Sequence, residues 1–215
     1  PLVFSALFKQ RDGVNYGAGS VLADDPLPQS IYTTGDGKSV MNFDNKFRGA
    51  IPIRSGLAES RNIPAIKAMY ISGRELTLNT IHDMGDKVYC TNGANREVGL
   101  AAAIGGCEVK QVEHTEAFAT IARMGVYKPP ASVIEVKNSE GQVIKKWKDE
   151  GNQVIDPQVP YMIADILSDD NARAPSYGRG ASGLVVPGVK TFTKTGTRNA
   201  GTKSKDLWMM STSPR

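Results

Sequence analysis

The alternation of apolar and polar residues along the chain predicts a mixture of helices and strands. Apolar positions recur at helical spacing in the segments 1–10, 51–59, 63–72, 75–84, 111–124 and 156–167. Pro64 and Pro157 suit the first turn of a helix, and Gly73 and Gly125 suit the position after the last turn. We therefore expect much of the chain to be helical, with proline and glycine marking several helix ends.

Strands are predicted in the second half of the chain. Residues 132–147 alternate apolar and polar side chains around the turn 138–141, which is typical of a β-hairpin. Threonine and aromatic residues over 189–197 favour a half-buried strand, and 206–210 would be its partner. Residues 11–48 are rich in Gly, Asp and Pro and are expected to form a long loop with a short strand at 30–33, while 168–185 would be a second loop.

The strand at 189–197 ends in Lys194-Thr195-Gly196-Thr197, a run of residue types that suits anion binding. Side chains alternate on a strand, so the hydroxyls of Thr195 and Thr197 share one face. Gly196 lets another backbone approach the strand edge, and Lys194 adds a positive charge. A strand that runs into a polar turn has the same composition, so these four residues alone do not decide the function.

A second polar run, Ser60-Arg61-Asn62, separates two predicted helices. Ser and Asn are favoured residues at helix starts, because their side chains accept hydrogen bonds from free backbone N–H groups. On local grounds, helix capping is therefore the preferred interpretation of this run.

Composition limits the function classes. The chain has 215 residues, of which 40% are hydrophobic and 22% charged, as in ordinary globular proteins. Its net charge of +4 comes from scattered Lys and Arg, which does not indicate a nucleic-acid-binding surface. Cys90 and Cys107 could form one disulfide or remain two thiols. Together with His82 and His114 they match no zinc spacing, so no metal or other cofactor is expected.

Taken together, the two polar runs resemble two of the three motifs of penicillin-binding transpeptidases. The segments around them are more specific than the motifs, and they occur in the family's order at 57–65, 117–125, 165–169 and 206–208. The resemblance covers nearly the whole chain and points to the bifunctional, class A group. It changes the preferred interpretation of Ser60 and Asn62 from helix caps to site residues, although Asn62 could serve as both.

One departure from the family pattern concerns its first motif, Ser-x-x-Lys, which supplies the nucleophile and its base. No serine in this sequence is followed by a lysine three residues later. In the family a proline and an apolar helix come after that motif, and residues 1–7 resemble this continuation. We therefore expect the sequence to begin just after the motif's lysine and to end before the family's last strand. We also expect that this chain alone is not acylated.

The resemblance implies acyl transfer from D-Ala-D-Ala stem peptides of peptidoglycan through a serine acyl-enzyme, which β-lactams imitate. It assigns catalytic roles to three residues: Ser60 would relay a proton to the leaving amine, Asn62 would hold the donor's amide, and Lys194 would tune the proton network. Substrate binding would fall to Asn62, Thr195, Gly196 and Thr197. The two threonines would bind the terminal carboxylate, and the Thr197 N–H would be one oxyanion donor.

The expected fold is α/β of the α+β kind, an antiparallel sheet flanked by helices on both faces, as in β-lactamases and transpeptidases, and truncated at both ends. Residues 1–215 would be one partial penicillin-binding transpeptidase domain. The expected partners are stem peptides and, in the parent protein, β-lactams. No nucleic acid is expected, and contact with a membrane is expected only through other parts of the parent. The expected location is extracytoplasmic, in the periplasm or on the outer face of a bacterial inner membrane.

Three alternatives stay open from the sequence. The first is a non-catalytic relative that keeps the penicillin-binding fold as a scaffold or sensor. The second keeps serine acyl chemistry but uses water as the acceptor, as in D,D-carboxypeptidases and serine β-lactamases. The third, a generic basic α/β binding module, would require every matched segment to be accidental.

Overall fold

The computed structural model describes residues 1–32, 39–91, 99–180, 183–200 and 203–213. The predicted α+β class with antiparallel strands is confirmed. In chain order the elements are α1 (Leu2–Phe8), β1 (Val21–Asp24), β2 (Gly49–Pro52), α2 (Ile53–Ala58), α3 (Asn62–Ser72), α4 (Arg74–Asp83), the 3₁₀ helix η1 (Leu100–Ile104), α5 (Gln111–Ala122), β3 (Val126–Tyr127), β4 (Glu135–Lys137), β5 (Val143–Lys146), β6 (Asn152–Gln153), α6 (Gln158–Ser168), α7 (Asp170–Tyr177), β7 (Phe192–Ala200) and β8 (Lys203–Thr212). Within the described ranges, no helix combines the length and hydrophobicity needed to span a bilayer.

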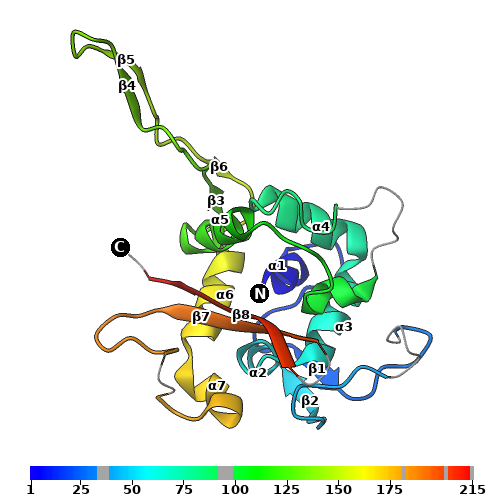
Figure 1. Ribbon diagram of the computed structural model, residues 1–215. Helices are drawn as coiled ribbons and strands as arrows, with labels where there is room; N and C mark the ends of the chain where they lie inside the picture. The colour runs from blue at the N-terminus through cyan, green and yellow to red at the C-terminus, as the bar shows by residue number, and fades with distance from the viewer. Residues whose placement is uncertain (33–38, 92–98, 181–182, 201–202, 214–215) are drawn as a thin grey trace.

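The helices are arranged around α1, which lies at the middle of the helical group in Figure 1. Every residue of α1 is buried, and Ala6 and Leu7 have no exposed surface. Because α1 is apolar on nearly all sides, it has to be covered by neighbours on all sides, and α3, α4 and α6 pack against it. The hydrophobic core is therefore centred on the first helix of the chain.

The described strands pair in two-stranded antiparallel sheets, of which β7–β8 is the longest. Its register runs from Phe192 opposite Thr212 to Ala200 opposite Lys203. Helix α6 packs against β7 and α5 packs against β8, so the ribbon lies against the helical group. The expected partnership between 189–197 and 206–210 is confirmed. β8 extends further than predicted at both ends, whereas β7 begins at Phe192 instead of 189 and continues to Ala200.

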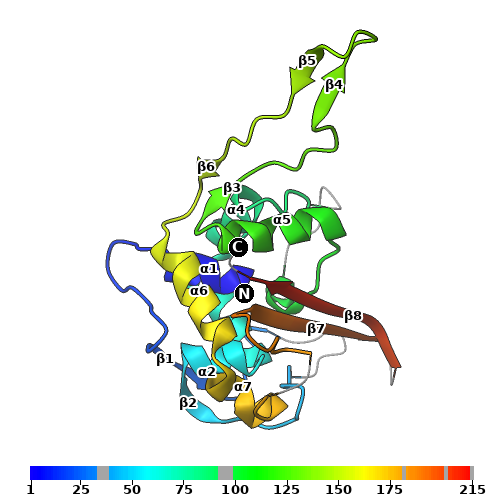
Figure 2. The ribbon, with the colours of Figure 1, turned by 90° about the vertical axis from the view of Figure 1, so that its left-hand side faces the viewer.

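A long arm projects from the body of the molecule, as Figures 1 and 2 show from two directions. It consists of the β4–β5 hairpin, joined to the body through the short β3–β6 pair. The hairpin predicted over 132–147 is confirmed. Ile134 and Ile144 in the arm are 59% and 66% exposed, so the arm adds nothing to the core.

Several predicted boundaries were wrong. The strand expected at 30–33 is absent at residues 30–32, which form a turn, and residue 33 lies outside the described ranges. The strand of this region is β1 instead, and its partner β2 occupies the first residues of the helix predicted from 51. The loop predicted at 168–185 contains helix α7, which begins after Asp169, whose side chain accepts a hydrogen bond from the Ala172 N–H at 3.0 Å. Asp169 is thus an N-cap.

The alternative left open for the cysteines is resolved. Cys90 and Cys107 form a disulfide with their Cα atoms 5.1 Å apart. The bridge spans 17 residues of sequence and joins the segment after α4 to the segment after η1.

Candidate functional site

The two polar motifs meet in space although 134 residues separate them. Lys194 Nζ on β7 donates a hydrogen bond to Ser60 Oγ at 2.6 Å and another to its neighbour's carbonyl, Thr195 O, at 2.7 Å. The ammonium therefore sits between the strand and the turn that joins α2 to α3. This contact defines the centre of the candidate site.

Ser60 lies in the turn between α2 and α3 with φ at 60°, in the left-handed region that side chains rarely adopt. Neighbouring charges hold this turn in place. The carboxylate of Glu59, which is 3% exposed, pairs with Arg48 at 3.1 Å and accepts a hydrogen bond from Ser176 Oγ at 3.3 Å. Glu59 thus connects the turn to Arg48, which precedes β2, and to Ser176 on α7.

Arg61, the middle residue of the motif, anchors the other side of the turn. Its side chain has no exposed surface and pairs with Asp24 at 2.9 Å and Asp44 at 2.7 Å. It also donates to Lys46 O at 2.5 Å. These contacts raise the pKa of Arg61 against the opposing effect of burial, which is the largest single cause. Arg61 is therefore a buried structural cation that fixes Ser60 and Asn62 on either side of it.

Asn62 begins α3, but its side chain does not cap the helix. Asn42 supplies that function from 20 residues earlier: its Oδ1 accepts from the backbone N–H of Asn62 at 2.9 Å and of Ile63 at 3.3 Å. The Asn62 Nδ2 donates to Met41 O at 2.9 Å. The capping role considered for Asn62 is therefore wrong, and its side chain is held toward the loop at residue 41.

Thr195 and Thr197 lie on the same face of β7, as strand geometry requires, and Gly196 lies between them opposite Trp208. Thr195 Oγ1 is 2.9 Å from the hydroxyl of Tyr177 on α7. In the part of the chain that the structure describes, β7 pairs with β8 alone, so the other edge of β7 has no partner strand. Two hydroxyls and a free strand edge thus lie directly beside Lys194.

The electrostatics of the site are dominated by Lys194. Burial lowers its pKa from 10.5 to about 8, because the charged ammonium is poorly solvated there. Pro1, the N-cap residue of α1, also lies near Lys194.

Sequence reasoning missed several residues that build this site. Arg61 was visible within the motif, but its buried partner Asp24 is 37 residues away. Asn42 lay in a stretch predicted to be loop, and Tyr177 lay in a second predicted loop that is helical in the structure. Buried salt bridges and side-chain contacts between distant segments leave no periodic signal in a sequence.

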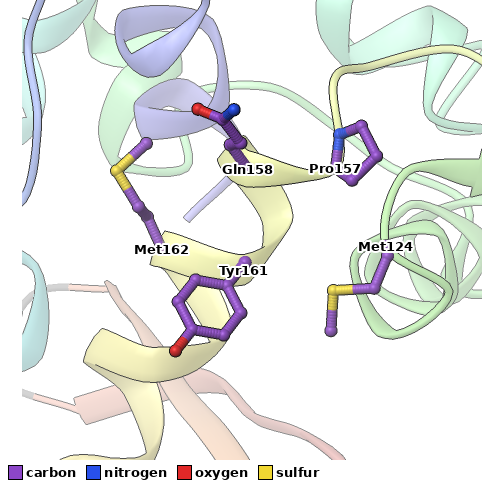
Figure 3. A pocket seen from close by; sticks show the side chains of 5 residues that line it. All are labelled: Met124, Pro157, Gln158, Tyr161 and Met162. Carbon is purple, nitrogen blue, oxygen red and sulfur yellow. The ribbon is translucent and has the colours of Figure 1, made fainter.

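A second hollow lies away from these residues. It has a volume of about 480 Å³ and is lined by Met124, Pro157, Gln158, Tyr161 and Met162, which Figure 3 shows between the end of α5 and the start of α6. None of these lining residues is positively charged, and none belongs to the two motifs. Across the described ranges no cluster of His, Cys, Asp and Glu could hold a metal ion. We therefore place the candidate site at the contact between Ser60 and Lys194.

Comparison with known proteins identifies the family of the chain. The model of the penicillin binding protein transpeptidase domain matches residues 17–215. Penicillin-binding protein 1A/1B of Bacillus subtilis is 27% identical over 201 residues, covering 88% of this chain and 21% of the relative. Penicillin-binding protein 1A of Mycobacterium tuberculosis is 25% identical over 224 residues, covering 99% of this chain and 26% of the relative. The chain thus spans about a quarter or less of the length of these relatives.

Solved structures show the same fold. The penicillin-binding protein PonA1 from Mycobacterium tuberculosis superposes with a TM-score of 0.78 at 22% identity, over 99% of this chain and 56% of that one. Penicillin-Binding Protein 1A from Haemophilus influenzae superposes with a TM-score of 0.73 at 20% identity, over 98% of this chain and 34% of that one. With the family model matching most of its length, the chain belongs to the penicillin-binding protein transpeptidase domain family.

Proposed function

We propose that residues 1–215 form part of a D,D-transpeptidase domain and supply the proton-transfer and carboxylate-binding wall of its site. The observation that carries this proposal is the 2.6 Å contact between Lys194 Nζ and Ser60 Oγ, which brings the two motifs into one hydrogen-bonded unit. The proposed substrate is an acyl-D-Ala-D-Ala stem peptide. We expect a β-lactam to bind in place of this peptide. The structure of the PonA1 protein from Mycobacterium tuberculosis in complex with penicillin V supports this expectation.

The proton path follows from the direction of the hydrogen bonds. An ammonium group only donates hydrogen bonds, so Ser60 Oγ accepts from Lys194. The hydroxyl proton of Ser60 is therefore free to point toward another group. When the bond between the penultimate carbonyl carbon and the leaving nitrogen breaks, that proton can pass to the nitrogen, and D-Ala leaves as an amine. With a pKa of about 8, Lys194 can restore a proton to Ser60 near neutral pH.

Substrate binding is proposed for the other predicted residues. Thr195 and Thr197 would donate to the terminal carboxylate, with Lys194 adding attraction at short range. The Thr197 N–H would be an oxyanion donor beside Gly196, where the strand edge allows close approach. Asn62 would bind the donor's amide after its side chain turns away from Met41 O.

The nucleophile of the proposed reaction is not among these residues. The printed sequence contains no Ser-x-x-Lys, so the covalent step depends on a serine from outside it. We place the domain outside the cytoplasm. The Cys90–Cys107 disulfide supports that location, since disulfides persist mainly in oxidising compartments.

The proposal is tested by reversible binding to the 215-residue chain. A diacetyl-L-Lys-D-Ala-D-Ala peptide should shift the backbone amide NMR signals of Asn62 and of residues 194–197, while the matched peptide ending in L-Ala-L-Ala should not. A labelled penicillin should leave no covalent adduct on this chain by mass spectrometry. Equal binding of the two peptides would overturn the substrate assignment, and a stoichiometric adduct would overturn the statement that the nucleophile lies elsewhere.

A further inference from the structure

Tyr177 connects α7 to the proposed carboxylate site and has no role in the mechanism above. Its hydroxyl lies 2.9 Å from Thr195 Oγ1, and this hydrogen bond is partly shielded from solvent. Tyr177 is the last residue of α7, a helix that the sequence pattern did not predict. The contact therefore arises from the way α7 packs, which makes it a specific feature of this chain's structure.

Counting protons fixes the direction of this hydrogen bond when an anion binds. Each hydroxyl carries one proton and can also accept, whereas a carboxylate only accepts. Thr195 can donate to a carboxylate only if its own proton is not given to Tyr177. Tyr177 must then be the donor and Thr195 Oγ1 the acceptor.

We propose that Tyr177 is a positioning residue that directs the Thr195 proton toward a bound carboxylate. This inference rests on the proposed function, because it takes the ligand to be the C-terminal carboxylate of a D-Ala-D-Ala peptide. By donating to Thr195, the phenol presets the threonine rotamer and its proton. The site then loses less rotational freedom when the ligand arrives.

The surroundings of Tyr177 explain why it acts through Thr195. A cavity of about 10 Å³ between α7 and β7 is lined by both residues together with Lys194 and Arg173. Such a space holds about one water molecule, so a peptide does not enter it. The preceding residue, Ser176, donates to Glu59, which is next to Ser60. Helix α7 therefore contacts both Thr195 and the residue before Ser60, and Tyr177 reaches the ligand only through Thr195.

The experiment compares two probes that differ only in their C-terminal group, the acid diacetyl-L-Lys-D-Ala-D-Ala and its C-terminal amide, titrated into the 215-residue chain by NMR. Wild type should bind the acid more tightly than the amide. Y177F keeps the ring and removes the donor, and should reduce the acid-over-amide ratio about three- to tenfold, as loss of one hydrogen bond would. In a T195V background, Y177F should have no further effect. Y161F, which alters a tyrosine that is 62% exposed on α6, is the matched control and should leave the ratio unchanged.

The outcomes separate this inference from the function on which it rests. If wild type shows no preference for the acid, both proposals fail. If wild type prefers the acid and Y177F keeps that preference, the proposal for Tyr177 alone fails. If Y177F weakens acid and amide equally, Tyr177 is merely structural and the proposal also fails. A ratio reduced by Y177F in wild type but not in T195V supports it.

Discussion

At the scale of single residues, the site depends on a turn that the backbone does not favour. Ser60 has a φ of 60°, and a non-glycine residue in this region costs about 1–2 kcal/mol. Arg61 and Glu59, buried on either side of it, are paired with Asp24, Asp44 and Arg48. The buried charges therefore do more than stabilise the fold, since they hold the Ser60 hydroxyl where Lys194 can reach it.

Two adjacent aspartates should therefore differ widely in their contribution to the free energy of unfolding. Asp24 has no exposed side-chain surface, whereas the side chain of Asp25 is 52% exposed and pairs with Lys67. D24N should lower the free energy of unfolding by about 3–5 kcal/mol, because Arg61 would stay buried with a weakened partner. D25N, the matched control, should cost about 1 kcal/mol or less. Urea unfolding of both variants measures the difference, and equal losses would contradict the role given to Arg61.

A second prediction at this scale concerns the titration of Lys194. Its pKa is lowered to about 8 by burial, so the ¹³Cε signal should titrate near that pH instead of near 10.5. As pH rises through 8, the ammonium becomes a neutral amine and the acid probe should bind more weakly. The folded state then holds fewer protons than the unfolded state, so the contribution of this group to stability should rise between pH 8 and 10.5.

Above pH 8, binding of the acid probe should weaken while the stability of the fold rises. This combination is expected of a buried lysine within the site. K194M serves as the control and should remove both the titration and the pH dependence of acid binding. A ¹³Cε midpoint near 10.5 would show that the ammonium is solvated and would contradict the proposed environment.

Residue chemistry was the part of the site most visible in the sequence. Hydroxyls two residues apart on a strand share a face in any sheet, so the relation of Thr195 to Thr197 followed from the pattern alone. The pairing of Lys194 with Ser60 came only from the family resemblance, because nothing local links positions 134 residues apart. Tyr177 and Asn42 act through contacts between distant segments, which a single sequence does not record.

At the scale of elements, most helices were predicted, but α7 was missed entirely. Asp169 is an N-cap, but Pro175 lies inside the helix and its residues are mostly polar, so no apolar face was visible. Strand β1 is only four residues long and lies in a Gly- and Pro-rich stretch. It exists because β2 pairs with it, which is tertiary context that overrides local pattern.

Two glycines with similar backbone conformations provide an element-scale prediction. Gly125, three residues after the end of α5, has φ at 90°, and a Cβ there would lie 2.2 Å from Ile155 O. Gly141 in the arm's turn has φ at 82°, and a Cβ there would meet nothing within 4 Å. G141A should therefore cost only about 1–2 kcal/mol for the left-handed conformation. G125A should cost roughly 2 kcal/mol more, because the backbone of 125 and 155 must separate.

Urea unfolding of G125A and G141A isolates the packing contribution, since the conformational cost is shared. The slope of unfolding free energy against urea concentration should be unchanged in both, because the surface exposed on unfolding is the same. Equal stability of the two variants would mean that the segment at Ile155 moves easily. That result would contradict close packing between the end of α5 and the strand region before α6.

At the scale of the whole molecule, the helices that form the core also support the strands that carry the candidate site. α1 is buried along its length, and Pro1, which precedes it, lies near Lys194. Helices α5 and α6 pack on the β7–β8 ribbon, which carries Lys194 and the two threonines. The arm extends away from these elements, so its exposed apolar residues contribute little to the folding free energy.

The last prediction concerns the Cys90–Cys107 disulfide, which adds a covalent constraint to the region around η1. The bridge closes a loop with a sequence separation of 17 residues. A loop of about this length contributes about 3 kcal/mol, chiefly by restricting the unfolded chain. Reduction with dithiothreitol should therefore lower Tm by roughly 6–12 °C for a chain of this size. The variant C90A/C107A should unfold at the reduced protein's Tm and should not respond to dithiothreitol. If wild type and the double variant unfolded at the same temperature without reductant, the native contacts of η1 with α3 would hold this region without the bridge.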